Sequence, residues 1–169
     1  MNKINSNLAA LLLFSATTSC AIAQGNDCIV HAAQCFKINP LVIKAIIWQE
    51  SGNKPGAVQH NRNKTIDVGL MQINSIHFNR LKSMGINETQ LRNDSCANVF
   101  AGTWILKENI DHYGYNWDSI GNFHSKTPKY HDAYMKKIIS LIAYKTRLIN
   151  KINIKESDNI SSLFSCPQE

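Results

Sequence analysis

The chain has 169 residues, with 18 Lys or Arg against 12 Asp or Glu, and therefore a formal net charge of +6 at pH 7. This length predicts a single domain that can bury roughly two thirds of its unfolded surface. The excess of basic residues favours an anionic polymer or surface as the binding partner. The chain has no dense basic stripe and no recognisable nucleic-acid-binding module, so we do not expect it to bind nucleic acid.

The first 23 residues are predicted to be a cleaved signal peptide. Lys3 provides the positive start, residues 8–14 the short apolar core, and Ala21-Ile22-Ala23 the small-x-small cleavage site. Because a membrane-spanning helix needs about 20 apolar residues, this stretch is too short to cross a bilayer. No later segment is long and uncharged enough either, so we expect no transmembrane segment in the mature chain.

Four cysteines remain after the leader: Cys28, Cys35, Cys96 and Cys166. An even number in an exported chain predicts two disulfides, and the sequence alone allows three pairings. There is no Cys-x-x-Cys and no His pair at metal-ligand spacing, so we expect neither a metal nor a cofactor.

Two helices and a β-wing are expected next. The first helix is capped by Asn26 or Asp27 and runs to residue 36, and the second begins with Asn39-Pro40 and stops at Gly52. Residues 57–68 contain two short β-type segments separated by the polar turn formers of residues 61–64, which predicts a small hairpin.

The remaining elements are expected to be helical. Ser75 caps a helix that ends near Gly85, a long helix covers residues 96–113, a further turn covers 117–123, and an amphipathic helix follows Pro128. We expect an α+β, mainly α domain over residues 24–150. Residues 151–169 read as a polar tail that is tied down only through Cys166.

Two carboxylates, Glu50 and Asp67, suggest a catalytic site. Glu50 ends an otherwise apolar helical run next to Trp48, and burial there should raise its pKa. Asp67 lies near the end of the expected hairpin and can face Glu50 across a groove. Paired carboxylates on either side of a sugar, one of them kept protonated, are typical of glycosidases. The plainer alternatives are a solvated helix-terminal Glu50 and an Asp67 that only caps a local element.

Residues beside the carboxylates are candidates for binding. Gly69 allows close backbone approach, Met71 offers an apolar shelf, and Gln72 offers an amide. Ser51 either orients the Glu50 carboxylate or caps the helix end. Taken singly, Gly69 also reads as a turn glycine, Met71 as core and Gln72 as a surface amide.

A family resemblance rests on four motifs in a fixed order: Glu50-Ser51-Gly52, Asp67-Val68-Gly69-Leu70-Met71-Gln72-Ile73-Asn74, Trp104-Ile105-Leu106 and Tyr113-Gly114. Together they resemble the lytic transglycosylases of the SLT type, which have a lysozyme-like fold. The chain is most similar to the small exported members that accompany secretion and conjugation machines. The resemblance covers about residues 28–145.

The resemblance implies a reaction. Glu50 would protonate the glycosidic oxygen between N-acetylmuramic acid and N-acetylglucosamine, then take a proton from the muramic hydroxymethyl oxygen that attacks the anomeric carbon. The product carries an anhydromuramic end. The implied catalytic pair is Glu50 and Asp67. The implied substrate-binding residues are Ser51, Gly69, Leu70, Met71, Gln72, Phe123, His124 and Tyr134.

This chain departs from the family pattern at one place. Where the family has Tyr-Asn, this chain has Phe123-His124, so Phe123 lacks the hydroxyl that reaches the catalytic carboxylate. Tyr134 matches a second family tyrosine and would reach Glu50 alone. The resemblance also implies a Cys28–Cys96 disulfide, which leaves Cys35 and Cys166 for a second one.

The implied function is local opening of the periplasmic cell wall during assembly of a conjugation or secretion apparatus. The expected partners are peptidoglycan strands and components of that machinery, and we expect a monomer. Two alternatives stay open. One is a lysozyme-type hydrolase that uses Asp67 as nucleophile or electrostatic stabiliser, and the other is a non-catalytic scaffold protein that binds the wall.

Overall fold

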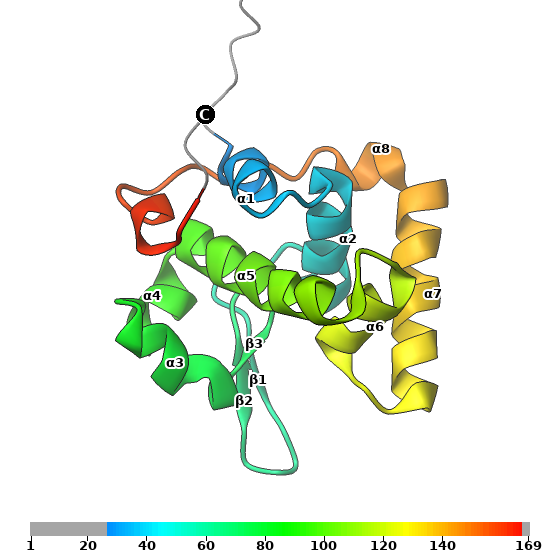
Figure 1. The fold of residues 1–169 in the computed structure, drawn as a ribbon, viewed down its shortest axis with the longest axis horizontal. Coiled ribbons are helices and arrows are strands. Elements are labelled where there is room, and N and C mark those ends of the chain that lie inside the picture. The colour runs from blue at the N-terminus through cyan, green and yellow to red at the C-terminus, as the bar shows by residue number, and fades with distance from the viewer. Residues whose placement is uncertain (1–26, 167–169) are drawn as a thin grey trace, which may run out of the picture.

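Helices account for most of the described chain, residues 27–166 of a computed structural model, and a small sheet lies among them (Figure 1). The helices are α1 (Cys28–Phe36), α2 (Pro40–Ser51), α3 (Phe78–Ser83), α4 (Glu88–Asn93), α5 (Ser95–Tyr113), α6 (Trp117–His124), α7 (Pro128–Tyr144) and α8 (Thr146–Ile149), with the 3₁₀ turns η1 (Ser75–His77) and η2 (Ser161–Leu163). This is the expected α+β, mainly α architecture.

Local side chains set the ends of the first two helices. Asp27 caps α1 by accepting a hydrogen bond from the Ile29 backbone N–H at 3.0 Å. Asn39 caps α2 in the same way, with Pro40 at the first helical position, where no backbone donor is needed. Gly52 ends α2 in the left-handed conformation, with φ 62°.

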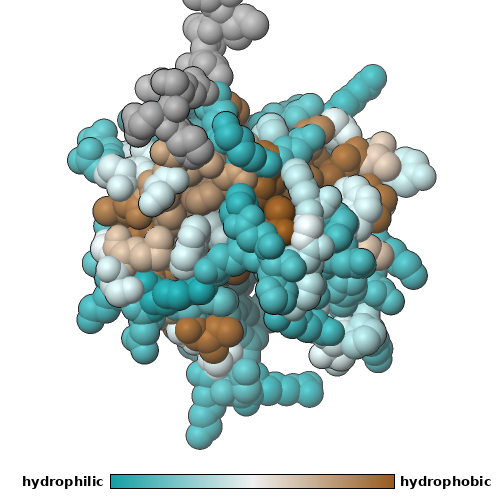
Figure 2. Space-filling model, viewed as in Figure 1, coloured by the Kyte–Doolittle hydropathy of each residue, from teal (hydrophilic) through white to brown (hydrophobic). Residues whose placement is uncertain are grey.

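Three short antiparallel strands form the expected β-wing. They are β1 (Val58–His60), β2 (Ile66–Val68) and β3 (Ile73–Asn74), in the order β1-β2-β3. The register pairs Gln59 with Asp67 and Asp67 with Asn74. The β1–β2 hairpin projects from the helical body in Figure 1, and Figure 2 shows hydrophilic side chains over its projecting end.

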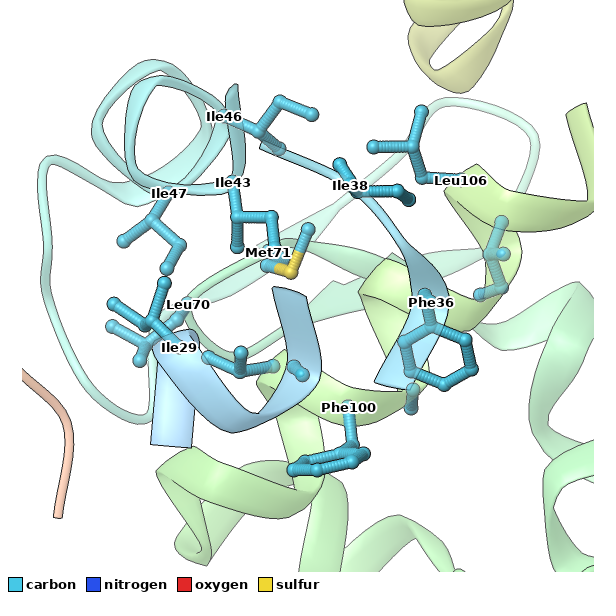
Figure 3. Packing of buried hydrophobic residues seen from close by; sticks show 14 of the residues in the cluster. Ile29, Phe36, Ile38, Ile43, Ile46, Ile47, Leu70, Met71, Phe100 and Leu106 are labelled. Atoms are coloured by element: carbon cyan, nitrogen blue, oxygen red, sulfur yellow. The ribbon is translucent and has the colours of Figure 1, made fainter. Parts of the chain in front are cut away.

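The hydrophobic core forms around α5, which packs against α1, α4 and α6. Figure 3 shows Ile43, Ile46 and Ile47 of α2 directed into the same interior as Leu70, Met71 and Phe100. Gly102 makes room for this packing, because a Cβ at that position would lie 2.6 Å from Met71 Sδ. The sheet is therefore packed against α5 through the residues that follow β2.

Two disulfides connect distant parts of the chain. Cys28–Cys96 joins α1 to α5, and Cys35–Cys166 joins α1 to the C-terminal segment. The first is the pair that the family resemblance implied, and the second is the pair that was left by elimination. Disulfides form and persist in oxidising compartments, so they indicate a location outside the cytoplasm.

The segment after residue 150 differs from the expected polar tail. Its apolar side chains are buried: Ile152, Ile154, Ile160 and Phe164. Backbone hydrogen bonds also hold it, because the Cys28 N–H donates to Ile154 O at 2.8 Å and Asp27 pairs with Lys155. The packing was not expected because the apolar residues of this segment are widely spaced and its overall composition is polar. The segment is attached by much more than its cysteine.

Other differences concern helices. The sequence analysis did not anticipate α4, and the last helix is broken at Lys145 into α7 and α8. Tyr130 and Leu148, near the two ends of the expected amphipathic helix, are 56% and 38% exposed. The predicted signal peptide lies outside the described residues. Within residues 27–166, no helix combines the length and the apolar character that crossing a membrane requires.

Candidate active site

Glu50 lies in the last turn of α2, at the wall of a cavity of about 460 Å³. Asp67, from β2, lines the same cavity, so the structure brings the two predicted carboxylates together. The other walls come from the sheet, α5 and the end of α6. We call this cavity the central cleft.

The Glu50 carboxyl is poorly solvated. Burial raises its pKa from 4.5 to about 7, and the negative charge of Asp67 adds to this rise. A hydrogen bond from Tyr134 and the positive charge of Lys137 act in the opposite direction but do not cancel the effect of burial. A large share of Glu50 is therefore protonated near neutral pH, as the sequence analysis expected.

Two asparagines hold Asp67 in place. Asn61 Nδ2 donates to Asp67 Oδ2 at 2.8 Å, and Asn74 Nδ2 donates to Oδ1 at 2.7 Å. Both amides also donate to Thr65 Oγ1, which ties the turn of the wing to the strands. Each carboxylate oxygen of Asp67 is thus fixed from a different strand end. The sequence analysis missed both asparagines, although the expected hairpin would bring Asn61 close to Asp67.

Tyr134 of α7 lies beside the Glu50 carboxyl. It is 3% exposed, and burial together with the neighbouring Glu50 raises the pKa of its phenol well above the usual value. The phenol therefore stays protonated and can only donate to the Glu50 carboxylate. The contact is loose, because neither Tyr134 Oη nor Glu50 Oε1 has a partner of full hydrogen-bond geometry among the described residues.

The predicted departure from the family pattern lies beside Tyr134. His124, the last residue of α6, stacks its ring on the Tyr134 ring with centroids 4.8 Å apart and planes 4° from parallel. Burial and the charge of Lys137 lower the pKa of His124, so its imidazole is neutral at pH 7. Phe123 and His124 both line the central cleft, as expected.

Four of the expected binding residues lie elsewhere. Leu70 and Met71 have no exposed surface and belong to the core. Met71 is therefore not the apolar shelf that was expected, and Leu70 is not a surface for binding. Gly69 is buried against Asn98. Ser51 Oγ donates to Ile47 O and so completes the helix end, which is the second of its two expected roles.

Asn98 of α5 explains this placement. Its Nδ2 donates to Val68 O and Leu91 O, both at 2.9 Å, and its Oδ1 accepts from the Met71 N–H at 2.8 Å. Gly69 has φ 77°, and a Cβ there would lie 2.0 Å from Asn98 Nδ2. The glycine is therefore required by close approach to Asn98, not by approach to a ligand.

Gln72 remains in the cleft wall. Its Nε2 donates to Gly69 O at 2.8 Å and to Ala57 O at 3.2 Å, which orients the amide across the start of the wing. The cleft as a whole therefore contains one protonated carboxyl, one carboxylate fixed by amides, and further amide groups. These groups suit a neutral ligand that has many hydroxyl groups and amide substituents, and the protonated carboxyl can transfer a proton to it.

Comparison with known proteins agrees with this chemistry. A family model described as "Transglycosylase SLT domain" matches residues 27–146. "Invasion protein IagB" of Salmonella typhimurium is 47% identical over 116 residues, covering 66% of this chain and 72% of that protein. "X polypeptide" of Escherichia coli is 34% identical over 104 residues, covering 62% of each chain. "Protein IpgF" of Shigella flexneri is 36% identical over 101 residues, covering 60% of this chain and 66% of that protein.

Proposed function

We propose that this chain, which belongs to the transglycosylase SLT domain family, is a peptidoglycan lytic transglycosylase. It cleaves the β-1,4 bond between N-acetylmuramic acid and N-acetylglucosamine and leaves an anhydromuramic end. The observation that carries the proposal is the pKa of Glu50, raised to about 7 at the wall of a cleft that Asp67 also lines. A carboxyl in that state supplies the proton that the leaving sugar needs.

The reaction uses Glu50 twice. Its carboxyl first donates a proton to the glycosidic oxygen, and the bond to the anomeric carbon breaks with both electrons leaving on that oxygen. The resulting Glu50 carboxylate then accepts the proton of the muramic C6 hydroxyl, whose oxygen bonds to the anomeric carbon. The ring closes intramolecularly, no water enters, and Glu50 ends protonated as it began.

Asp67 would stabilise the positive charge that develops on the sugar ring while the bond breaks. Its two oxygens already accept hydrogen bonds from Asn61 and Asn74, at 2.8 and 2.7 Å. Those bonds hold the carboxylate in one orientation. Tyr134 would donate to Glu50 in the ionised intermediate state and so help it to give up its first proton.

A lysozyme-type hydrolase is the second candidate, because Asp67 in the cleft completes a carboxylate pair of the kind hydrolases use. Mass spectrometry of muropeptides released from purified sacculi separates the two. Transglycosylase products are lighter by one water than the reducing ends that a hydrolase makes. A digest that contains only reducing ends would overturn the lyase assignment.

The Glu50→Gln variant tests whether the protein is an enzyme at all. The change removes the transferable proton and keeps the shape of the side chain, so release of muropeptides should fall below detection. If the wild-type protein releases no muropeptides and Glu50→Gln supports the cellular process as well as wild type does, the protein is a non-catalytic scaffold that binds the wall. Circular dichroism of the variant checks that loss of release is not loss of fold.

The cellular role follows from the same assignment. We propose export by a leader over residues 1–23, a transglycosylase domain over residues 24–150 followed by residues 151–169, and work as a monomer in the periplasm. There it would open the wall locally for a conjugation or secretion apparatus. The two disulfides and the basic net charge of the chain support a place beside an anionic wall polymer.

A further inference from the structure

A second cavity of about 520 Å³ continues the central cleft along α5. The two cavities share His77, Ile105, Phe123 and His124 in their walls. They therefore form one furrow with two sections, and we call the second section the distal cleft. A polymer bound at Glu50 that extends in this direction has to pass along it.

The two sections differ in charge. The described residues that line the central cleft include two carboxyl groups, Glu50 and Asp67, and no Lys or Arg. Those that line the distal cleft include Arg80, Lys126 and His112, with Glu108 as the only acid. Neutral sugars suit the first section, whereas the second section attracts anions.

The acid of the distal cleft is already neutralised. Arg80 makes two parallel hydrogen bonds to Glu108, at 2.8 Å and 2.7 Å, and its guanidinium lies 4.4 Å from the centre of the Trp104 ring. This pair forms a fixed wall that contributes no net charge. Lys126 therefore determines the charge of the section.

Lys126 is exposed and held over an aromatic ring. Its Nζ lies 5.4 Å from the centre of the Tyr113 ring, and no carboxylate oxygen of the described residues pairs with it within salt-bridge distance. The contact with Tyr113 limits the freedom of a long side chain without neutralising its charge. The Lys126 ammonium group is therefore charged, restricted in position and without a carboxylate partner, which suits it to bind an anionic ligand.

We propose that the distal cleft binds the carboxylates of the peptide stems that the glycan carries, with Lys126 as the residue that recognises them. This inference rests on the proposed function, because the stems are attached to the muramic residues of the strand that lies in the central cleft. The stems contain acidic residues with free carboxylates, whereas the sugars of a stem-bearing strand have none, because the lactyl carboxyl of each stem-bearing muramic residue is bound in the amide to its stem. The enzyme therefore prefers stem-bearing strands to stripped ones.

The test compares two substrates: purified glycan strands with their stems, and the same strands after an amidase has removed the stems and the lactyl carboxylates that this exposes have been converted to amides. For Lys126→Ala, KM on stem-bearing strands should rise about three- to tenfold, the size expected for one partly exposed charge-assisted contact. Its kcat, and both constants on stripped strands, should stay at the wild-type values. Lys126→Arg should restore KM because it keeps the charge.

Lys129→Ala is the matched control, since Lys129 is an exposed lysine at the start of α7 that does not line the distal cleft. It should leave both substrates unaffected. For Lys126→Ala, an equal loss on both substrates, or no loss on either, would overturn the proposal.

Binding of the Glu50→Gln protein to sacculi, with and without Lys126→Ala, tests the site separately from catalysis. If Lys126→Ala weakens that binding while wild type releases no muropeptides, the proposed reaction fails and the recognition site stands. Unchanged binding would overturn the recognition site.

Discussion

The ring of His124 stacks on the ring of Tyr134, with centroids 4.8 Å apart and planes 4° from parallel. The stack connects the end of α6 to α7, and Tyr134 in turn interacts with the Glu50 carboxyl. Tyr134 has no other aromatic partner among the described rings, so His124 fixes the plane in which its hydroxyl approaches Glu50. His124 is thus a positioning residue that acts through Tyr134.

His124→Ala should lower kcat about two- to tenfold, the range that corresponds to losing one aromatic stack. His124→Phe keeps a flat ring in the same place and should retain most of the activity. Muropeptide release by both variants at saturating sacculi measures the effect. If the Phe variant is as slow as the Ala variant, the imidazole itself is needed and the positioning role is wrong.

Tyr134→Phe removes the phenol hydroxyl that lowers the pKa of Glu50, so this pKa should rise above about 7. Because the reaction begins with protonated Glu50, the activity of wild type should fall as pH rises past about 7. In the variant this fall should move to higher pH, with a lower maximal rate. Carbon NMR of the labelled Glu50 carboxyl checks the pKa directly, and an unchanged titration would contradict the prediction.

Glu50 should also make folding pH-dependent. Its pKa is 4.5 when exposed and about 7 in the folded protein, so the folded state holds its proton more tightly. Between these values the unfolded state releases the proton and the folded state keeps it. The free energy of unfolding therefore loses about 3 kcal/mol as pH rises from 4.5 to 7.

Glu50→Gln removes that loss. Relative to wild type, the free energy of unfolding of the variant should increase across this pH window, as measured by urea denaturation at several pH values. Asp158→Asn, at an exposed position, is the control and should show no such trend. A constant difference between Glu50→Gln and wild type from pH 4.5 to 7 would show that the carboxyl is solvated.

Asn98→Ala should destabilise the protein by about 3 kcal/mol or more, since it leaves Val68 O, Leu91 O and the Met71 N–H without their buried partner. Thermal and urea unfolding measure this loss. Asn93→Ala, at an exposed position of α4, should change stability by less than about 0.5 kcal/mol. Similar effects of the two changes would show that the Asn98 network contributes little.

Local signals made much of the fold predictable. Asn39-Pro40 and Gly52 mark the ends of α2 because a cap side chain, a proline and a left-handed glycine act within one turn of the chain. The hairpin followed from the polar turn of residues 61–64. The helix α4 has a comparable signal, a capping box between Asn87 and Gln90, but only Leu91 of its six residues is buried, so its hydrophobic periodicity is weak.

The site was predictable only in part, because its geometry depends on distant residues. A carboxyl at the end of an apolar helix was enough to expect the raised pKa of Glu50. The burial of Leu70 and Met71, however, depends on Asn98, about thirty positions further along the chain. The relation of His124 to Tyr134 likewise depends on how α6 packs on α7. Motif spacing contains no information on either contact.

The pairing of Asp27 with Lys155 and the Cys35–Cys166 disulfide hold both ends of the described chain near α1, on the side away from the projecting hairpin (Figure 1). A fluorescent reporter or an affinity handle fused at either end would therefore emerge from the same region. Neither would stand over the furrow between the wing and α6. Labelled forms of this protein should consequently report where it works in living cells without blocking its access to the wall.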